Sequence, residues 1–375
     1  MWTKNAVMFG YDGSEPGGSA SALTIKNTGN LNMYGQDSAG IYLLRKAAVN
    51  LIMNSPINLY GDSSAGIYVP LANDASNSSI EGTFKVNIGD TNVGNQLYSN
   101  SGISTAGDPI SNYDVNPSDV NPSDPAYDKT LIRNSFGILS TAPISLTSHE
   151  IKIYDKTQKN VGVMPNRDVL LTLGTGSIEI HGEDTAKDNI GIYVNGKGAV
   201  KSTGNVTIDK GIGNLAVFAK GGTLPSGATE QVNVNKIEGT NTKNSVFIYA
   251  ESTGTTGATV KASELNISNA TIEADANTDN KKDTGAIFAT GTNTVVTVDR
   301  TSAPSSANIE IIGRERKDAI TGEAAGYVGF GFFANKGATI EADYNSLKKL
   351  IWIMEKLNIV DQGMRYFLMV LEKLI

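Results

Sequence analysis

Apolar and polar residues alternate over many short stretches of this chain. Examples are FKVNI at 84–88, SIEI at 177–180 and NVTI at 205–208. Alternation with a period of two predicts strands that bury one face and expose the other. Turns rich in Gly, Asp and Asn separate these stretches from second runs that are aliphatic and then aromatic. The pattern therefore predicts pairs of short strands joined by turns.

Two N-terminal stretches are nearly alike, LNMYGQDSAGIYL at 31–43 and INLYGDSSAGIYV at 57–69. Later segments keep the order small, apolar, aromatic, small, followed by a glycine turn: HGEDTAKDNIGIYVNGKG at 181–198, GIGNLAVFAKGG at 211–222, NSVFIYAESTG at 244–254, DTGAIFATGTN at 283–293 and GYVGFGFFANKGA at 326–338. Where no insertion intervenes, copies recur at about 25 residues, a period typical of solenoids.

Short strands that repeat at one period predict stacked rungs, each pairing with its neighbours at about 4.8 Å. We expect an all-β fold, a right-handed parallel β-helix, over residues 1–343, with about 14 rungs. Glycine is expected to form left-handed turns at the corners, and each aromatic side chain to be buried and to stack on the next copy. The structural repeat positions are Gly35, Gly40, Tyr42, Gly61, Gly66, Tyr68, Gly191, Tyr193, Phe218, Tyr249, Phe288 and Phe333.

Residues 99–130 interrupt the repeat. They contain no strand-like run and carry the tandem VNPSD at 115–119 and 120–124. Solenoids accept insertions at rung corners, and such loops often lie on the binding face. We therefore predict a polar loop insertion here.

Residues 344–375 differ from the repeats. Leu347, Leu350, Ile351 and Met354 follow helical spacing, which predicts a short helical tail that caps the last rung. The alternative is a frameshift. If this segment is written in A/T-rich codons and the reading frame is moved by two bases, the new amino-acid sequence looks like another repeat unit. We favour this hypothesis, in which residues from about 346 onward do not belong to the natural fold.

Composition narrows the class of protein. The chain has no Cys and a formal net charge of −7 at pH 7. The acidic balance argues against a nucleic-acid partner, which needs a basic face, and the lack of Cys excludes disulfides. The sequence as given shows neither a signal peptide nor an apolar run of about 18 residues, so we expect no transmembrane segment.

The turn Gly-Asp-Ser-Ser-Ala-Gly at 61–66 is a candidate for a catalytic serine. A nucleophile elbow has the form Gly-x-Ser-x-Gly, and the spacing around Ser38 and Ser64 does not fit it. The sister copy reads Gly-Gln-Asp, and a site residue is rarely duplicated in every rung. The turn is therefore interpreted as structural.

The chain has two histidines. His149 is expected between two strands, and His181 aligns with Tyr34 and Tyr60 as the last strand residue before the glycine turn. Neither has a second histidine at ligand spacing, which argues against a zinc site.

The acidic residues offer two further candidates. Glu183 with Asp184, and Glu310 with Glu315, could form the carboxylate pair of a glycosidase, but each pair lies at a turn without a recurring face. Calcium ligands could come from Asp114, Asp119, Asp124 and Asp128, although the spacing of a calcium loop is absent. The sequence thus predicts no catalytic, cofactor-binding or metal-binding residue.

The units YGDSSAGIY, GIYVNGKG and LAVFAKGG, together with AVMFGYDGS at 6–14, resemble the passenger regions of large type V autotransporter adhesins, especially fusobacterial ones. The resemblance covers most of residues 5–343. It implies export through a C-terminal β-barrel translocator and display at the cell surface or outer membrane. It also implies non-catalytic attachment to host or bacterial cell-surface proteins or glycans, with no cofactor. The chain lacks the signal, the barrel and much of a passenger's usual length, so we expect a fragment of a longer protein.

A β-helical polysaccharide-degrading enzyme or tailspike-like depolymerase is the alternative. Such an enzyme needs a non-repeated cluster of acidic or basic residues on one face, and the sequence pattern reveals none.

Overall fold

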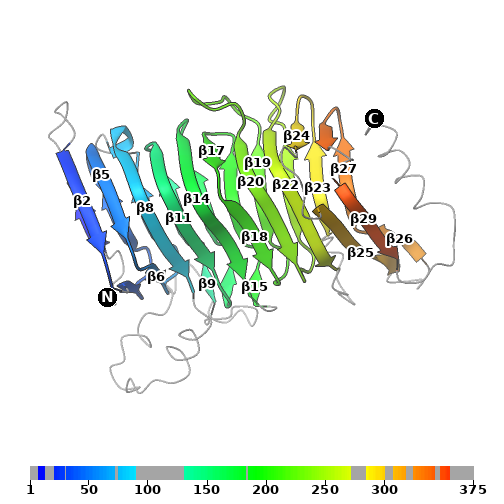
Figure 1. Cartoon of the computed structure of the whole chain (residues 1–375), viewed down its shortest axis with the longest axis horizontal. Helices are drawn as coiled ribbons and strands as arrows, with labels where there is room; N and C mark the ends of the chain where they lie inside the picture. Colours follow the sequence, from blue (N-terminus) through cyan, green and yellow to red (C-terminus); the bar gives the residue numbers. More distant parts are fainter. Residues whose placement is uncertain are drawn as a thin grey trace, which may run out of the picture.

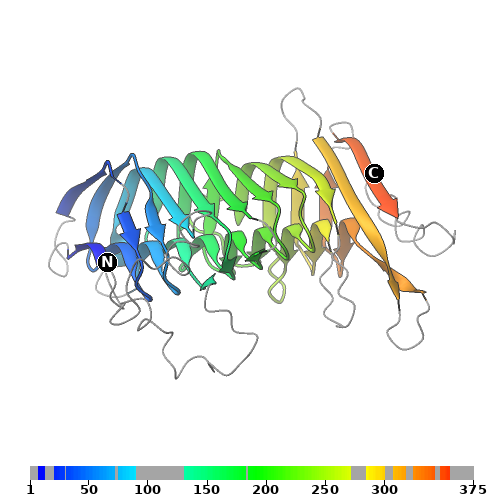
Figure 2. The same cartoon turned by 90° about the horizontal axis from the view of Figure 1, so that it is seen from below.

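The computed structural model describes residues 7–12, 21–29, 31–71, 75–89, 131–182, 185–271, 284–299, 307–317, 324–342 and 347–354. Over these residues the chain winds repeatedly through two long parallel sheets. Strands that follow one another in the sequence recur side by side along the long axis, from the N-terminal to the C-terminal end (Figure 1). Seen from below, the successive turns form one elongated stack (Figure 2).

Sheet A contains one strand from each turn, and its ten strands follow chain order. They are β1 (Val7–Tyr11), β4 (Ala39–Leu43), β7 (Ala65–Val69), β10 (Phe136–Ser140), β13 (Val161–Pro165), β16 (Ile190–Asn195), β19 (Leu215–Lys220), β21 (Val246–Glu251), β23 (Gly285–Thr290) and β27 (Phe330–Asn335).

Sheet B contains 16 strands. Its main path runs through β2 (Ser21–Asn27), β5 (Ala47–Met53), β8 (Ser79–Ile88), β11 (Ile144–Ile153), β14 (Leu170–His181), β17 (Ala199–Ser202), β20 (Val232–Thr240), β22 (Thr259–Ala270), β24 (Val295–Val298) and β28 (Thr339–Ala342). The remaining strands are β3 (Leu31–Met33), β6 (Ile57–Leu59), β18 (Asn205–Asp209), β25 (Ala307–Lys317), β26 (Ala324–Val328) and β29 (Leu347–Met354).

A short third sheet joins β9 (Ile132–Arg133), β12 (Thr157–Gln158) and β15 (Ala186–Lys187). Strand pairs are parallel except β25 with β26, and the described residues contain one 3-10 turn (Ala75–Asn77) but no α-helix. The predicted all-β parallel solenoid is confirmed.

The core lies between the two sheets and follows from the alternation in the sequence. In β5 buried residues alternate strictly with half-buried ones, and Val49, Leu51 and Met53 are each 1% exposed. In most turns of sheet A an aliphatic residue precedes an aromatic one and is fully buried, as Ile41 and Ile192 are. Each rung therefore adds a layer of aliphatic side chains to one continuous core, whose burial stabilises the stack.

Seven described corners that lead into sheet A, from β4 to β21, have the same local structure, in which a residue with positive φ precedes a buried polar residue. The buried residues form a line that we call the polar ladder: Ser38, Ser64, Ser135, Asn160, Asn189, Asn214 and Ser245. The backbone N–H of each of the first six donates to the side-chain oxygen of the next, over 2.8 to 3.2 Å. Buried backbone groups at the corners thereby gain partners without water.

Left-handed glycines are confirmed at several turns, since Gly89, Gly196, Gly211 and Gly213 have positive φ. The repeat glycines Gly35, Gly40, Gly61, Gly66 and Gly191 have none, and Asp37 and Ser63 adopt positive φ at the corners beside them. Gly40, Gly61, Gly66 and Gly191 are needed for close approach: a Cβ at Gly66 would lie 2.6 Å from the carbonyl oxygen of Gly137 in the next turn. Side chains would force neighbouring rungs apart at these positions.

Two further expectations need correction. Among the described residues, sheet A has ten strands rather than about 14 rungs, because several turns are longer than the shortest repeat. Ile67, for example, pairs with Ile138.

The prediction of a helical tail over residues 344–375 is also wrong for its first part. Leu347–Met354 is strand β29 and pairs in parallel with β25. Its sequence LKKLIWIM is rich in Ile and Trp, which favour strands, and β25 offers it an edge. Residues 355–375 and the predicted insertion at 99–130 lie outside the described residues.

Candidate binding surfaces

The first candidate surface is a row of large apolar side chains on the outer face of sheet A, which we call the aromatic row. Register places one member on each strand from β4 to β27: Tyr42, Tyr68, Leu139, Met164, Tyr193, Phe218, Tyr249, Phe288 and Phe333. All nine are half-buried. The predicted burial of the aromatic residues was therefore wrong, because the residue before each of them, aliphatic except for Phe332, fills the core.

The aromatic rings stack in two groups. Tyr42 and Tyr68 have ring centroids 5.5 Å apart. The longer group runs through Tyr193, Phe218, Tyr249, Phe288 and Phe333, with neighbouring centroids 4.9 to 5.3 Å apart. Leu139 and Met164 separate the two groups in register. Because the faces of the rings cover one another, mainly their edges remain for a partner.

Polar groups border the longer group on one side. Lys220 and Glu251 form an ion pair at 3.3 Å, and the Tyr249 hydroxyl donates to Glu251 Oε2 over 3.3 Å. Burial, with a smaller effect from the Glu251 charge, raises the pKa of Tyr249 above its usual value. The tyrosine is therefore neutral at physiological pH, and the row stays apolar.

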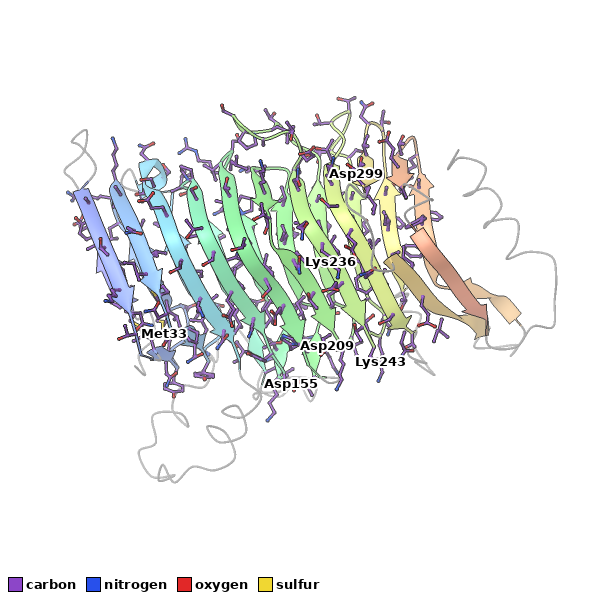
Figure 3. All side chains as sticks on the ribbon, viewed as in Figure 1. Met33, Asp155, Asp209, Lys236, Lys243 and Asp299 are labelled. Carbon is purple, nitrogen blue, oxygen red and sulfur yellow. The ribbon has the colours of Figure 1, made fainter. Side chains whose placement is uncertain are left out.

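The second candidate surface is a polar cluster on the outer face of sheet B. Ser177, Glu179 and His181 occupy alternate positions of β14, so their side chains share that face. Register places Lys152 of β11 beside Glu179 and Asp209 of β18 beside His181. Figure 3 labels Asp209 on this face, together with Lys236 of β20.

His181 is the centre of the cluster. Its Nε2 contacts Glu179 Oε2, its Nδ1 lies 3.8 Å from Asp209 Oδ2, and its ring stacks against Tyr154 at 5.8 Å. Ser177 also donates to Glu179. The hydrogen bond from His181 lowers the pKa of Glu179 to about 2, and the same bond raises the pKa of His181.

This arrangement limits the chemistry that the cluster can perform. Glu179 is ionised at any physiological pH, so it cannot act as a general acid. His181 is the one member that could donate a proton near neutral pH. In the described part of the chain, no group of three or more His, Cys, Asp or Glu side chains is arranged to hold a metal ion.

The structure places the other sequence candidates apart from both surfaces. Ser38 and Ser64 are buried members of the polar ladder, as expected of a structural turn. His149 lies within β11 rather than between strands, because the alternating pattern runs unbroken across SHEIKI. Glu310 accepts a hydrogen bond from the backbone of Asn269 over 3.1 Å.

The remaining acidic candidates cannot be placed. Glu183, Asp184 and the four aspartates at 114, 119, 124 and 128 lie outside the described residues, as does the side chain of Glu315.

Sequence reasoning missed the polar cluster. Its members lie in HEIKIY, SIEIH and NVTID, three strands that are far apart in sequence but adjacent in register. The signal is present, since outward polar positions alternate with inward isoleucines in each strand. It becomes visible only when the three segments are aligned on those isoleucines.

No family model, curated protein or solved structure matches the chain significantly. Among the helices of the described residues, none is long and apolar enough to cross a membrane.

Proposed function

We propose that this chain is a segment of a non-catalytic surface adhesin of the autotransporter passenger type, which attaches to host or bacterial cell-surface proteins or glycans. The observation that carries the proposal is the aromatic row, which extends over nine strands of sheet A and stays half-exposed along the whole face. A surface of this kind suits broad contact with a partner rather than conversion of a small substrate.

A cell-binding assay tests the proposal. Beads coated with the purified chain are expected to bind bacterial or epithelial cells, and the combined Tyr193→Ser, Phe218→Ser and Tyr249→Ser variant to lose most of that binding. The matched control is Lys85→Ser, Lys152→Ser and Lys236→Ser on the outer face of sheet B. Equal binding by both variants and the parent would refute a role for sheet A.

Treatment of the cells identifies the class of partner. Loss of binding after protease treatment indicates a protein, and loss after glycosidase treatment indicates a glycan. DNA sequence across the locus supplies an independent test, because an adhesin passenger requires an export signal upstream and a barrel downstream. Intact flanking DNA that encodes neither would argue against the autotransporter class.

One observation favours a second function, a β-helical polysaccharide-degrading enzyme. The polar cluster gathers Glu179, His181, Asp209 and Lys152 on one face, the kind of convergence that such chemistry needs. Release of reducing sugar from bacterial polysaccharides, abolished by His181→Ala and by Asp209→Asn, would establish it. The adhesin proposal is preferred because Glu179 and His181 are bound to each other and Lys152 is paired with Glu150 at 2.8 Å.

A further inference from the structure

His149 lies in the interior of the solenoid, in the middle of β11. Its side chain is 3% exposed, and it occupies an inward position between the buried residues Leu146 and Ile151. In register it follows Phe84 of β8 and precedes Gly176 of β14. A titratable side chain therefore occupies a column of the core directly after a phenylalanine.

Neither ring nitrogen of His149 has a hydrogen-bond partner among the described residues. Buried polar atoms without partners are rare, because each forfeits its interaction with water. The ring fits because the next two turns have glycine beside it: a Cβ at Gly204 would lie 2.9 Å from His149 Cε1. The geometry gives the imidazole room but no partner.

No charge compensates the imidazole from the surrounding elements. The inward residues nearest in register are apolar, namely Val86, Ile151, Ile178 and Val206. The charged and titratable residues of the neighbouring sheet B strands alternate with the inward positions; they are Glu81 and Lys85 of β8, Glu150 and Lys152 of β11, Glu179 and His181 of β14, Lys201 of β17 and Asp209 of β18. The facing strands β10 and β13 of sheet A contain no charged residue.

Burial alone thus lowers the pKa of His149, to about 4 from the ordinary 6.5. An imidazole released into water regains the ordinary value. Between the two values the opened state binds a proton that the closed state does not, so opening becomes easier as the pH falls through this range and is unaffected well above it.

We propose that His149 is an acid-sensitive latch in the middle of the solenoid, at which β11 separates from β8 and β14 in mildly acidic surroundings. Opening is favoured at this point because the β8–β11 ladder already has a register shift between Leu146 and Ser148. The Gly176 and Gly204 column also supplies no side-chain packing on the other side of the ring. The latch would expose the inner faces of neighbouring rungs to a partner or a protease in an acidic compartment.

Hydrogen exchange on the full chain at pH 7.5 and pH 5 tests the latch, after correction for the intrinsic pH dependence of exchange. Protection of amides in β8, β11 and β14 is expected to fall by a factor on the order of ten between these values, whereas β21 and β23 stay protected. The variants are His149→Phe, which repeats the side chain of Phe84, and His149→Gln, which stays polar but does not titrate. Both are expected to lose the local pH dependence, and its persistence in either folded variant would overturn the proposal.

A second measurement leaves His149 itself unchanged. In a His181→Asn background His149 is the one histidine that remains, so its ring signals can be followed by NMR. The proposal requires the folded protein to keep the ring neutral down to about pH 4. Titration near pH 6.5 in the folded protein would overturn it.

Discussion

At the scale of single residues, the turn that contains Gly239 and Phe247 differs from the others in where its large core side chain lies. The large side chain is at position 247, and glycine is at position 239. Gly239 pairs with Ile208 and Ile267, so glycine replaces an isoleucine of the column. Phe247 occupies the place that Gly191 and Ala216 occupy in earlier turns. A Cβ at Gly239 would lie 2.0 Å from Phe247 Cε1, so the ring fills the space of the missing isoleucine.

This exchange predicts strong coupling. Phe247→Gly should cost about 3–5 kcal/mol through the cavity that it leaves, and Gly239→Ile should be destabilising through overpacking. The double variant restores the arrangement of the other turns and should recover most of the loss. Urea unfolding of the four proteins measures the coupling, and additive effects would contradict this account.

The polar cluster predicts a pH-dependent stability at His181. Because the pKa of Glu179 is lowered in the folded protein, Glu179 stabilises the fold at pH values above the ordinary pKa of a glutamate. This stabilisation is lost as the pH falls toward 2. Because the pKa of His181 is raised in the folded protein, His181 stabilises the fold at pH values below the ordinary pKa of a histidine. This stabilisation is lost as the pH rises through the pKa that His181 has in the folded protein. The pair is therefore most stabilising at mildly acidic pH, where His149 acts in the opposite direction.

Replacing His181 by Gln should cost on the order of 0.5 kcal/mol at pH 5.5 and less at pH 9, since both partners retain contact with solvent. Thermal unfolding at the two pH values measures the difference, and Lys85→Gln on the same face controls for loss of an exposed charge. A cost that is equal at both pH values would exclude the ion pair as its source.

At the scale of the repeated element, the polar ladder joins successive corners through buried side chains. Asn160 accepts from the backbone of Ser135 over 2.8 Å and donates to the carbonyl of Ile132 over 2.9 Å. Asn160→Ala would leave both buried groups unpaired, at a cost of about 2–4 kcal/mol. Asn160→Ser should cost less, because serine makes the equivalent bond at Ser64 and Ser135. The urea unfolding midpoints of the two variants test this prediction. Equal losses of stability would mean that the site depends on side-chain volume and not on the hydrogen bonds.

The strands of these elements, and left-handed glycines at some of their turns, could be predicted from the sequence, but the polar corner residues could not. Alternation in segments such as FKVNI reports burial on one face directly, and this was sufficient for the solenoid. The partial exposure of Tyr193 was missed because, in a pair of an aliphatic and an aromatic residue, the sequence does not show which of the two side chains faces the core. Residues such as Asp37 were missed because positive φ at a polar corner residue leaves no periodic signal.

The candidate surfaces depend on register, which a single strand does not encode. Lys152, Glu179 and Asp209 belong to different turns, and only the stacking of Ile153, Ile180 and Ile208 brings them together. The latch at His149 is equally hidden, because the sequence pattern suggested a position between two strands and could not show the absence of hydrogen-bond partners around the ring.

At the scale of the whole molecule, the described strands at the N-terminal end of the stack have unpaired edges. Among the described residues, β1, β2 and β3 each pair on one side only, with β4, β5 and β6. Apolar side chains there, including Phe9 and Leu31, pack against the core but remain partly exposed. Unpaired parallel edges beside exposed apolar side chains favour pairing with another chain.

We therefore predict that this chain, expressed as given, self-associates through its end rungs. A contact between unlike ends does not close, so the assemblies should lengthen with concentration. Phe9→Lys with Leu31→Lys places charges at the edge and should shift light-scattering masses toward the monomer. Leu71→Lys is the matched control, because Leu71 is 65% exposed but lies outside the end rung. A monomeric parent at high concentration, or an equal shift with Leu71→Lys, would show that the strand edges do not govern assembly.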